Sequence, residues 1–139
     1  SESIDSINFE EYIHEFASEL LNTSPNDISI SVTINRPSLS IEKTVPLGLI
    51  FNELLTNSIK HAKVDQKLKI SIKYKKTNTN EKFTYIDNGK GVFNMNALDK
   101  NKVSLGLTLI ETLSSQLESK IEYKSDEQGF KFTIEGNFD

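Results

Sequence analysis

The order of its hydrophobic periods restricts the fold of this chain more than any other feature of the sequence. Segments with helical spacing of apolar residues alternate with pairs of segments that have the two-residue period of a strand. Helices are expected over 7–21, 46–63 and 105–117. Strands are expected over 28–34, within 36–43, and over 68–76, 81–87, 120–125 and 129–138. The order αββαββαββ predicts a two-layer α/β (α+β) sandwich, with one mixed, mostly antiparallel sheet covered by helices on one face.

Length and composition favour one globular domain over residues 1–139. The chain is too short for two domains, and 36% apolar with 26% charged residues excludes disordered and collagen-like classes. Its formal net charge of −4 argues against nucleic acid as the main partner. The chain begins with a serine and has its single methionine at Met95, so we expect a fragment of a longer protein.

Cysteine is absent, which excludes thiol nucleophiles, disulfides and thiolate zinc sites and fits a reducing cytosol. No apolar run reaches the 18 or so residues that span a bilayer, and no signal peptide opens the chain. We therefore expect a cytoplasmic segment without membrane contact, although missing regions of a longer protein can still carry a membrane anchor.

A narrow polar stripe runs along the helix expected over 46–63. At about 100° per residue, Glu53, Asn57 and Lys60 fall within roughly 60° of arc, one turn above the next. A solvated helix face usually pairs Glu with Lys at a spacing of four, whereas here an amide lies between the charges. The stripe predicts groups aimed at a ligand.

Two glycine-containing stretches are less specific when taken alone. "YIDNGKGV" (85–92) ends a strand at Asp87, and Gly89 and Gly91 would let a ligand touch the backbone. A carboxylate there can accept a hydrogen bond from the amino group of a base such as adenine, although "DNG" is also an ordinary hairpin signal. In "SLGLTLI" (104–110), Gly106 is expected to open a helix, where free backbone N–H groups attract phosphate.

In combination and in order, these stretches resemble the N, G1 and G2 boxes of histidine kinases. "VPLGLIFNELLTNSIKHA" (45–62) is similar to the N box of the subclass that reads "PLGLIxNELxTNxxKHA". The family belongs to an ATPase superfamily shared with gyrase, MutL and the ninety-kilodalton heat-shock chaperones. The resemblance extends from Val45 to about Ile134 and implies a Bergerat-type ATP-binding fold. Residues 1–44, an N-terminal helix and strands, resemble the end of the segment that joins phosphoacceptor helices to the catalytic domain.

The resemblance assigns roles to the polar stripe. Asn57 would give its side-chain oxygen to Mg²⁺, and Lys60 would neutralise phosphate charge. Glu53 would act as a general base or contact magnesium through water, the alternative being a solvated helix residue. His61 would contact the nucleotide or simply favour the negative end of its helix.

The resemblance also assigns the nucleotide contacts. Asp87 would accept a hydrogen bond from the adenine amino group. Gly89 and Gly91 would let the loop lie against the base and ribose, and Val92 would pack against the nucleotide or in the core. Residues 94–103 resemble the ATP lid, from which Lys100 or Lys102 would reach the phosphates, unless they are solvated loop charges. The G2 segment, with backbone N–H groups on the phosphates, would contain Ser104, Leu105, Gly106 and Thr108.

Two positions depart from the family pattern. Ser104 stands where orthodox kinases usually have glycine, a change that the subclass often allows. Gly129-Phe130 replaces a Gly-Thr pair whose hydroxyl often supports the adenine-binding aspartate through a water. That hydroxyl is missing here or comes from elsewhere, with Thr84 and Thr133 as candidates.

The implied reaction moves the γ-phosphoryl of ATP, with Mg²⁺, to a histidine on an upstream phosphoacceptor/dimerisation domain and then to an aspartate of a response regulator receiver domain. His14 lies on an amphipathic helix without the flanks of a phosphoacceptor, so we interpret it as a surface residue. We therefore expect an isolated, monomeric domain that binds ATP and phosphorylates itself poorly.

Two alternatives remain. A stand-alone serine protein kinase of the anti-sigma-factor type shares the boxes and a similar length, but its N box usually lacks the "PLGLIxNEL" lead. A degenerate binding module without catalysis is disfavoured by the intact Glu53, Asn57, Asp87, Gly89 and Gly91.

Overall fold

The computed structural model describes residues 6–24, 27–36, 38–90 and 100–139. The helices are α1 (Phe9–Thr23), α2 (Ile41–His61) and α3 (Lys100–Gln116). The strands are β1 (Ser6–Ile7), β2 (Ile28–Thr33), β3 (Leu39–Ser40), β4 (Leu68–Thr77), β5 (Asn80–Asp87), β6 (Lys120–Asp126) and β7 (Gly129–Gly136). Within these described residues, no helix combines the length and apolar character needed to cross a bilayer.

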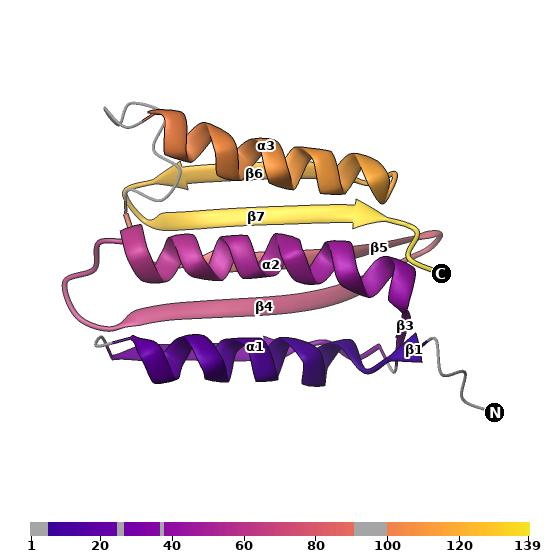
Figure 1. Cartoon of the computed structure of the whole chain (residues 1–139), viewed down its shortest axis with the longest axis horizontal. Helices are drawn as coiled ribbons and strands as arrows, with labels where there is room; N and C mark the ends of the chain where they lie inside the picture. Colours follow the sequence, from indigo (N-terminus) through magenta and orange to yellow (C-terminus); the bar gives the residue numbers. More distant parts are fainter. Residues whose placement is uncertain (1–5, 25–26, 37, 91–99) are drawn as a thin grey trace.

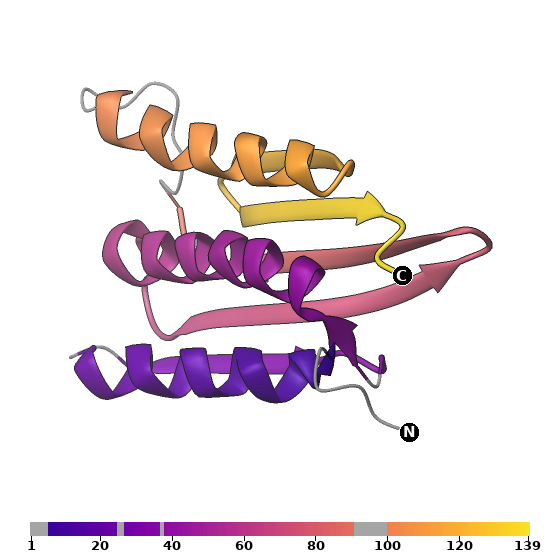
Figure 2. The same cartoon turned by 45° about the vertical axis from the view of Figure 1, so that its right-hand side comes forward.

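The main sheet has five strands in the order β2-β4-β5-β7-β6. β2 runs parallel to β4, and the pairs β4–β5, β5–β7 and β6–β7 are antiparallel. All three helices cover the same face of this sheet (Figure 1), and the turned view keeps them in one layer (Figure 2). The predicted two-layer sandwich with a mixed sheet is confirmed.

Most boundaries lie within two residues of the prediction, and three features differ more clearly. The short strand expected within 36–43 is β3, and it pairs with β1 in a separate two-stranded sheet. α2 begins at Ile41, capped by the Ser40 side chain, so Pro46 lies inside the helix and not in its first turn. α3 begins at Lys100, five residues earlier than expected, because Gly106 is accommodated inside a helix and does not start one.

Side chains along β5 alternate between the two faces of the sheet, and those on the inner face pack against the helices. Phe83, Tyr85 and Asp87 all lie on the inner face of the strand and are at most 1% exposed. Phe83 packs edge-on against Phe51 of α2, with 5.9 Å between ring centroids. The same two-residue period therefore carries the side chain of Asp87 into the layer between the sheet and α2.

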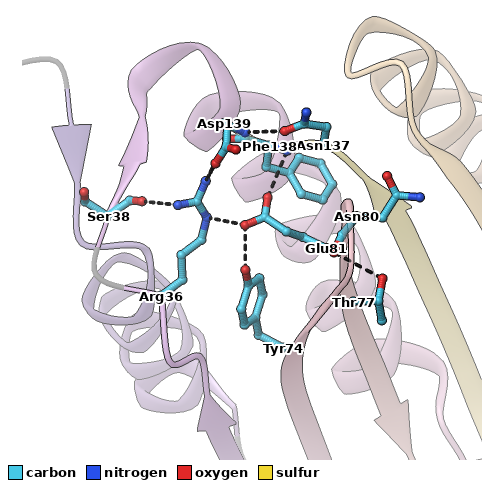
Figure 3. Close-up of polar contacts among 9 residues, drawn as sticks. All are labelled: Arg36, Ser38, Tyr74, Thr77, Asn80, Glu81, Asn137, Phe138 and Asp139. Carbon is cyan, nitrogen blue, oxygen red and sulfur yellow. Dashed lines mark hydrogen bonds and ion pairs between the residues drawn. The ribbon is translucent and has the colours of Figure 1, made fainter.

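At the other end of β5, an ionic cluster holds the last residues of the chain (Figure 3). Glu81, 4% exposed, accepts hydrogen bonds from the Tyr74 hydroxyl at 2.5 Å and the Phe138 N–H at 2.9 Å. Arg36 Nε lies 3.0 Å from the same carboxylate and forms an ion pair with it, without a hydrogen bond from this nitrogen. Arg36 also donates to the Phe138 carbonyl and to Asp139. Burial and the bond to Glu81 raise the pKa of Tyr74 to about 12.

Candidate functional site

Glu53 and Asn57 form a hydrogen-bonded pair one turn apart on α2. The Asn57 amide nitrogen donates to the Glu53 backbone carbonyl at 2.9 Å and to Glu53 Oε1 at 3.0 Å. Both bonds engage the nitrogen, and the amide oxygen accepts no hydrogen bond within the described part of the chain. The amide is thus oriented with its oxygen turned away from Glu53 and without a donor among the described residues, and oxygen is the atom type that a hard cation prefers.

The carboxylate of Asp87 is held at both oxygens. The Gly89 N–H donates to Oδ1 at 2.8 Å, and the Ser58 hydroxyl donates to Oδ2 at 2.5 Å. Ser58 is on α2 directly after Asn57, so one helix carries both the free amide oxygen and the partner of the buried acid. About 100° of helix rotation separates the two side chains, which directs one outward and the other toward β5.

Burial sets the protonation behaviour of this acid. Desolvation raises the pKa of Asp87 above its ordinary value of 3.8, and hydrogen bonds from Ser58, Gly89 and the Phe130 backbone partly oppose that rise. Tyr85, on the same face of β5, is fully buried, and desolvation raises its pKa well above the ordinary range. Ionised Asp87 is therefore a poorly hydrated acceptor, which suits a ligand that brings an N–H group.

Close backbone packing explains two glycines at this end of the sheet. A Cβ on Gly89 would lie 2.3 Å from the Ala62 Cβ, at the end of α2. Gly129 has φ near +140°, and a Cβ there would lie 2.2 Å from the Asp87 carbonyl oxygen. Both glycines bring backbone against the strand end that presents Asp87.

Gly89→Ala should therefore lower the free energy of unfolding by about 1–3 kcal/mol, the usual cost of an overpacked site. It should also weaken nucleotide binding, because any shift of the Gly89 N–H releases Asp87 Oδ1. Urea denaturation and calorimetric titration with ATP measure the two effects.

The paired variant Ala62→Gly/Gly89→Ala removes the Cβ that causes the clash and should recover most of the lost stability. Wild-type stability in Gly89→Ala alone would contradict the packing explanation.

The remaining residues of the polar stripe and N box lie apart from these contacts. Lys60 and His61 are exposed in the last turn of α2, and neither side chain forms an ion pair or hydrogen bond with another described residue. They are free to meet a ligand, and their expected roles stay predictions.

Several predicted residues fall where the structure gives little or no description. Gly91 and Val92, and positions 94–99 of the expected lid, lie outside the described residues. Lys100, Lys102, Ser104 and Leu105 belong to α3, but their side chains are not described. Gly106 is buried and Thr108 exposed, both beyond the first turn of α3, where backbone N–H groups point to carbonyls within the helix.

Neither threonine considered as the hydroxyl partner of Asp87 can reach it. Thr84 and Thr133 face each other across β5 and β7, with Thr84 one residue from Tyr85, so both lie on the sheet face away from the helices. Those candidates were wrong, and the hydroxyl comes from Ser58. The sequence contained a signal for it, because Ser58 continues the buried row of Phe51, Leu54 and Leu55, where a polar side chain needs a partner.

The residue set fits a metal held jointly with a ligand. Among the residues that the structure describes, no group of three or more His, Cys, Asp or Glu side chains could hold a metal ion. Mg²⁺ commonly takes one or two protein oxygens and completes its shell with phosphate and water. The oriented oxygen of Asn57 matches that mode.

Comparison with known proteins gives one family and a consistent fold. A family model described as histidine kinase-, DNA gyrase B- and HSP90-like ATPase matches residues 42–138. The histidine kinase domain of the blue-light activated histidine kinase from Erythrobacter litoralis EL346 has a TM-score of 0.80 at 18% identity, over 99% of this chain and 66% of that chain.

Two further solved structures are similar. The catalytic domain of histidine kinase ThkA has a TM-score of 0.70 at 16% identity, over 96% of this chain and 94% of that chain. The mycobacterial sensor histidine kinase MprB has a TM-score of 0.71 at 15% identity, with coverage of 94% and 95%. A longer chain of the Erythrobacter kinase is matched over only 42% of its length. At these identities the likeness establishes the fold, that of a histidine kinase ATPase domain.

Proposed function

The chain belongs to the histidine kinase-, DNA gyrase B- and HSP90-like ATPase family, and from this premise we propose that it is the ATP-binding catalytic domain of a sensor histidine kinase. The observation that carries the proposal is the position of Asp87. Its buried carboxylate meets the same helix, α2, that presents the free amide oxygen of Asn57. A purine at Asp87 and a metal-bound triphosphate at Asn57 would share that helix.

Each residue then has a defined task. Asp87 accepts a hydrogen bond from the adenine amino group, while Asn57 would give its oxygen to Mg²⁺, which supplies charge neutralisation at the phosphates when bound. Glu53 holds the amide of Asn57 and is the candidate base. Exposed Lys60 adds a point charge at the phosphates.

The proposed reaction breaks the bond between the γ-phosphorus and the β,γ-bridging oxygen and forms a phosphorus–nitrogen bond to a histidine, with ADP as the leaving group. That histidine would be on an upstream dimerisation domain, and a receiver aspartate of a response regulator would accept the group next. Phosphoryl transfer depends mainly on positioning and charge neutralisation, which a site of one acid, one amide and a lysine can provide.

The anti-sigma-factor type of serine kinase is the second candidate, because its boxes would place the same groups at the nucleotide. The two differ in what receives the phosphoryl group. A reading frame that continues upstream into a pair of phosphoacceptor helices supports the histidine kinase, and an independent short gene supports the serine kinase.

Asn57→Ala tests the phosphate end of the site. We expect ATP affinity in excess Mg²⁺ to fall about 10-fold or more, the scale of losing one hydrogen-bonded or coordinating contact to a charge. Affinity in EDTA should change by less than about twofold. Calorimetric titration under both conditions gives the comparison.

Glu53→Gln is the matched control, because glutamine keeps an acceptor oxygen for the Asn57 amide. It should retain the Mg²⁺-dependent part of binding and lose transfer activity if Glu53 is the base. Equal losses for Asn57→Ala with and without metal would contradict the metal role.

Self-phosphorylation should be slow in this chain. The side chain of His14 is 56% exposed on α1, with Nε2 4.0 Å from Glu10 Oε1, and α1 packs on β2 at the edge of the sheet (Figure 1). Incubation with γ-labelled ATP should label His14 little, whereas an added phosphoacceptor domain should take up label. Efficient incorporation on His14, lost in His14→Gln, would overturn this expectation.

A further inference from the structure

We propose that Ser58 is the positioning residue that makes Asp87 selective for a 6-amino purine, an inference that rests on the proposed nucleotide site. Ser58 fixes Oδ2 of the carboxylate from α2, while the Gly89 N–H fixes Oδ1 from the loop after β5. Together with the hydrogen bond from the Phe130 backbone on β7, these two bonds fix the orientation of the carboxylate. The direction of its remaining lone pairs is thereby set before any ligand arrives.

The Ser58 hydroxyl is itself oriented by Tyr85. The two hydroxyl oxygens are 2.5 Å apart, and Tyr85 Oη is 3.2 Å from the Leu54 carbonyl. Both side chains are fully buried, so water donates no hydrogen bond to either hydroxyl. Each hydroxyl has a single proton to donate.

These constraints fix the order of donation when Asp87 is ionised. A carboxylate only accepts, so Ser58 gives its proton to Asp87, and Tyr85 must then give its proton to Ser58. The Leu54 carbonyl receives at most a share of the Tyr85 proton. Every hydroxyl proton in the network is therefore committed, and none is available to a ligand.

Selectivity follows from that proton count. A 6-amino purine brings an N–H donor, which the held carboxylate accepts. A 6-oxo purine brings an acceptor oxygen, which would face a carboxylate with no donor to offer. An unpaired buried polar group is costly, so the second base is rejected.

A purely structural role for Ser58 makes a different prediction. If the hydroxyl only satisfies a buried acid, its removal should lower stability and weaken all nucleotides alike. If it sets the lone pairs of Asp87, its removal should weaken ATP more than ITP, which differs at position 6 of the purine. The ratio of the two affinities separates the roles.

The experiment uses ATP and ITP as probes with wild type, Ser58→Ala, Ser58→Thr and Ser114→Ala. Ser114 is the matched control, because it is also a buried helical serine, 2% exposed, whose hydroxyl donates to the Ile110 carbonyl at 2.7 Å on α3. We expect Ser58→Ala to weaken ATP about 10-fold and ITP less than twofold. Ser58→Thr should restore much of the ATP preference, and Ser114→Ala should leave the ratio unchanged whatever its stability.

An unchanged ATP/ITP ratio in Ser58→Ala, with ATP binding that still depends on Asp87, overturns the role of Ser58 alone. Wild-type protein that binds neither nucleotide, or that binds ATP equally well after Asp87→Asn, overturns the proposed function as well. If Ser58→Ala does not fold, Ser58→Thr and Tyr85→Phe decide the matter. Tyr85→Phe removes the proton that orients Ser58 and should lower the ATP preference, and full preference in this variant counts against the network.

Discussion

Asp87→Asn is expected to weaken ATP binding by about 100-fold, with or without Mg²⁺, because it removes a charged acceptor and places an N–H group opposite the purine amino group. Titrations in Mg²⁺ and in EDTA should show the same loss. This pattern is the reverse of that expected for Asn57→Ala, since the acid lies at the base and the amide at the phosphates.

The same substitution should leave the fold at least as stable as the wild type. Desolvation raises the pKa of Asp87 in the folded protein above 3.8, so the ionised form is disfavoured by folding. The stability linked to this carboxyl is fully present below its ordinary pKa and is lost as pH rises through the folded pKa. Asparagine cannot ionise, and its amide can still accept from Gly89 and donate to Ser58.

Urea denaturation of both proteins at several pH values tests the linkage. The difference in unfolding free energy, variant minus wild type, should grow as pH rises from about 4 toward neutrality. Asp27→Asn, at a side chain 81% exposed on the edge of the sheet, serves as a control that should change neither binding nor this difference. A variant that is less stable than wild type at neutral pH and recovers in acid would contradict the account.

The strands could be predicted because apolar residues alternate with polar residues along them, and the structure buries the apolar face. The alternation in 68–76 and 81–87 matches β4 and β5 within one residue at each end, and the strand expected over 129–138 is β7, which ends two residues earlier. One face of each strand is buried by helices, and a period of two is the direct result of one-sided burial.

Helix starts could not be predicted as well, because local signals compete with tertiary packing. Pro46 suggested a first turn, but Ser40 caps the helix earlier, and Thr44 donates to the Ser40 carbonyl at 2.8 Å. The β1–β3 pair depends on two residues meeting two others more than 30 positions away, which no local pattern encodes. Long-range pairing of such short strands is decided by the packing around them.

The site was predictable where it follows the helical period and unpredictable where it crosses between elements. The 3.6-residue repeat stacks Asn57 on Glu53, and the structure joins them by a hydrogen bond. The contact from Ser58 to Asp87 spans 29 residues and depends on how α2 is rotated over β5. The sequence indicates that Ser58 lies on the buried face of its helix and therefore needs a partner, but it does not indicate which residue that partner is.

Arg36→Ala is expected to lower the free energy of unfolding by about 2–3 kcal/mol without changing nucleotide affinity. The substitution leaves the carboxylate of Glu81 buried with two neutral donors among the described residues, the Tyr74 hydroxyl and the Phe138 N–H. Loss of one partner of a fully buried pair costs about 3–5 kcal/mol. The value here is smaller because the Arg36 side chain is 16% exposed and Glu81 keeps those two bonds. Urea denaturation measures the loss.

Two comparisons show whether the loss of stability comes from the unpaired charge on Glu81. Adding Glu81→Gln to Arg36→Ala removes that charge and should recover part of the stability, whereas Lys75→Ala, at an exposed cation nearby, should change it by less than about 0.5 kcal/mol. ATP affinity should stay at the wild-type value below the melting range, because Glu81 and Asp87 are six positions apart along β5, roughly 20 Å of strand. Equal stability of the single and double variants would mean that Arg36 contributes through its bonds to the chain end and not through Glu81.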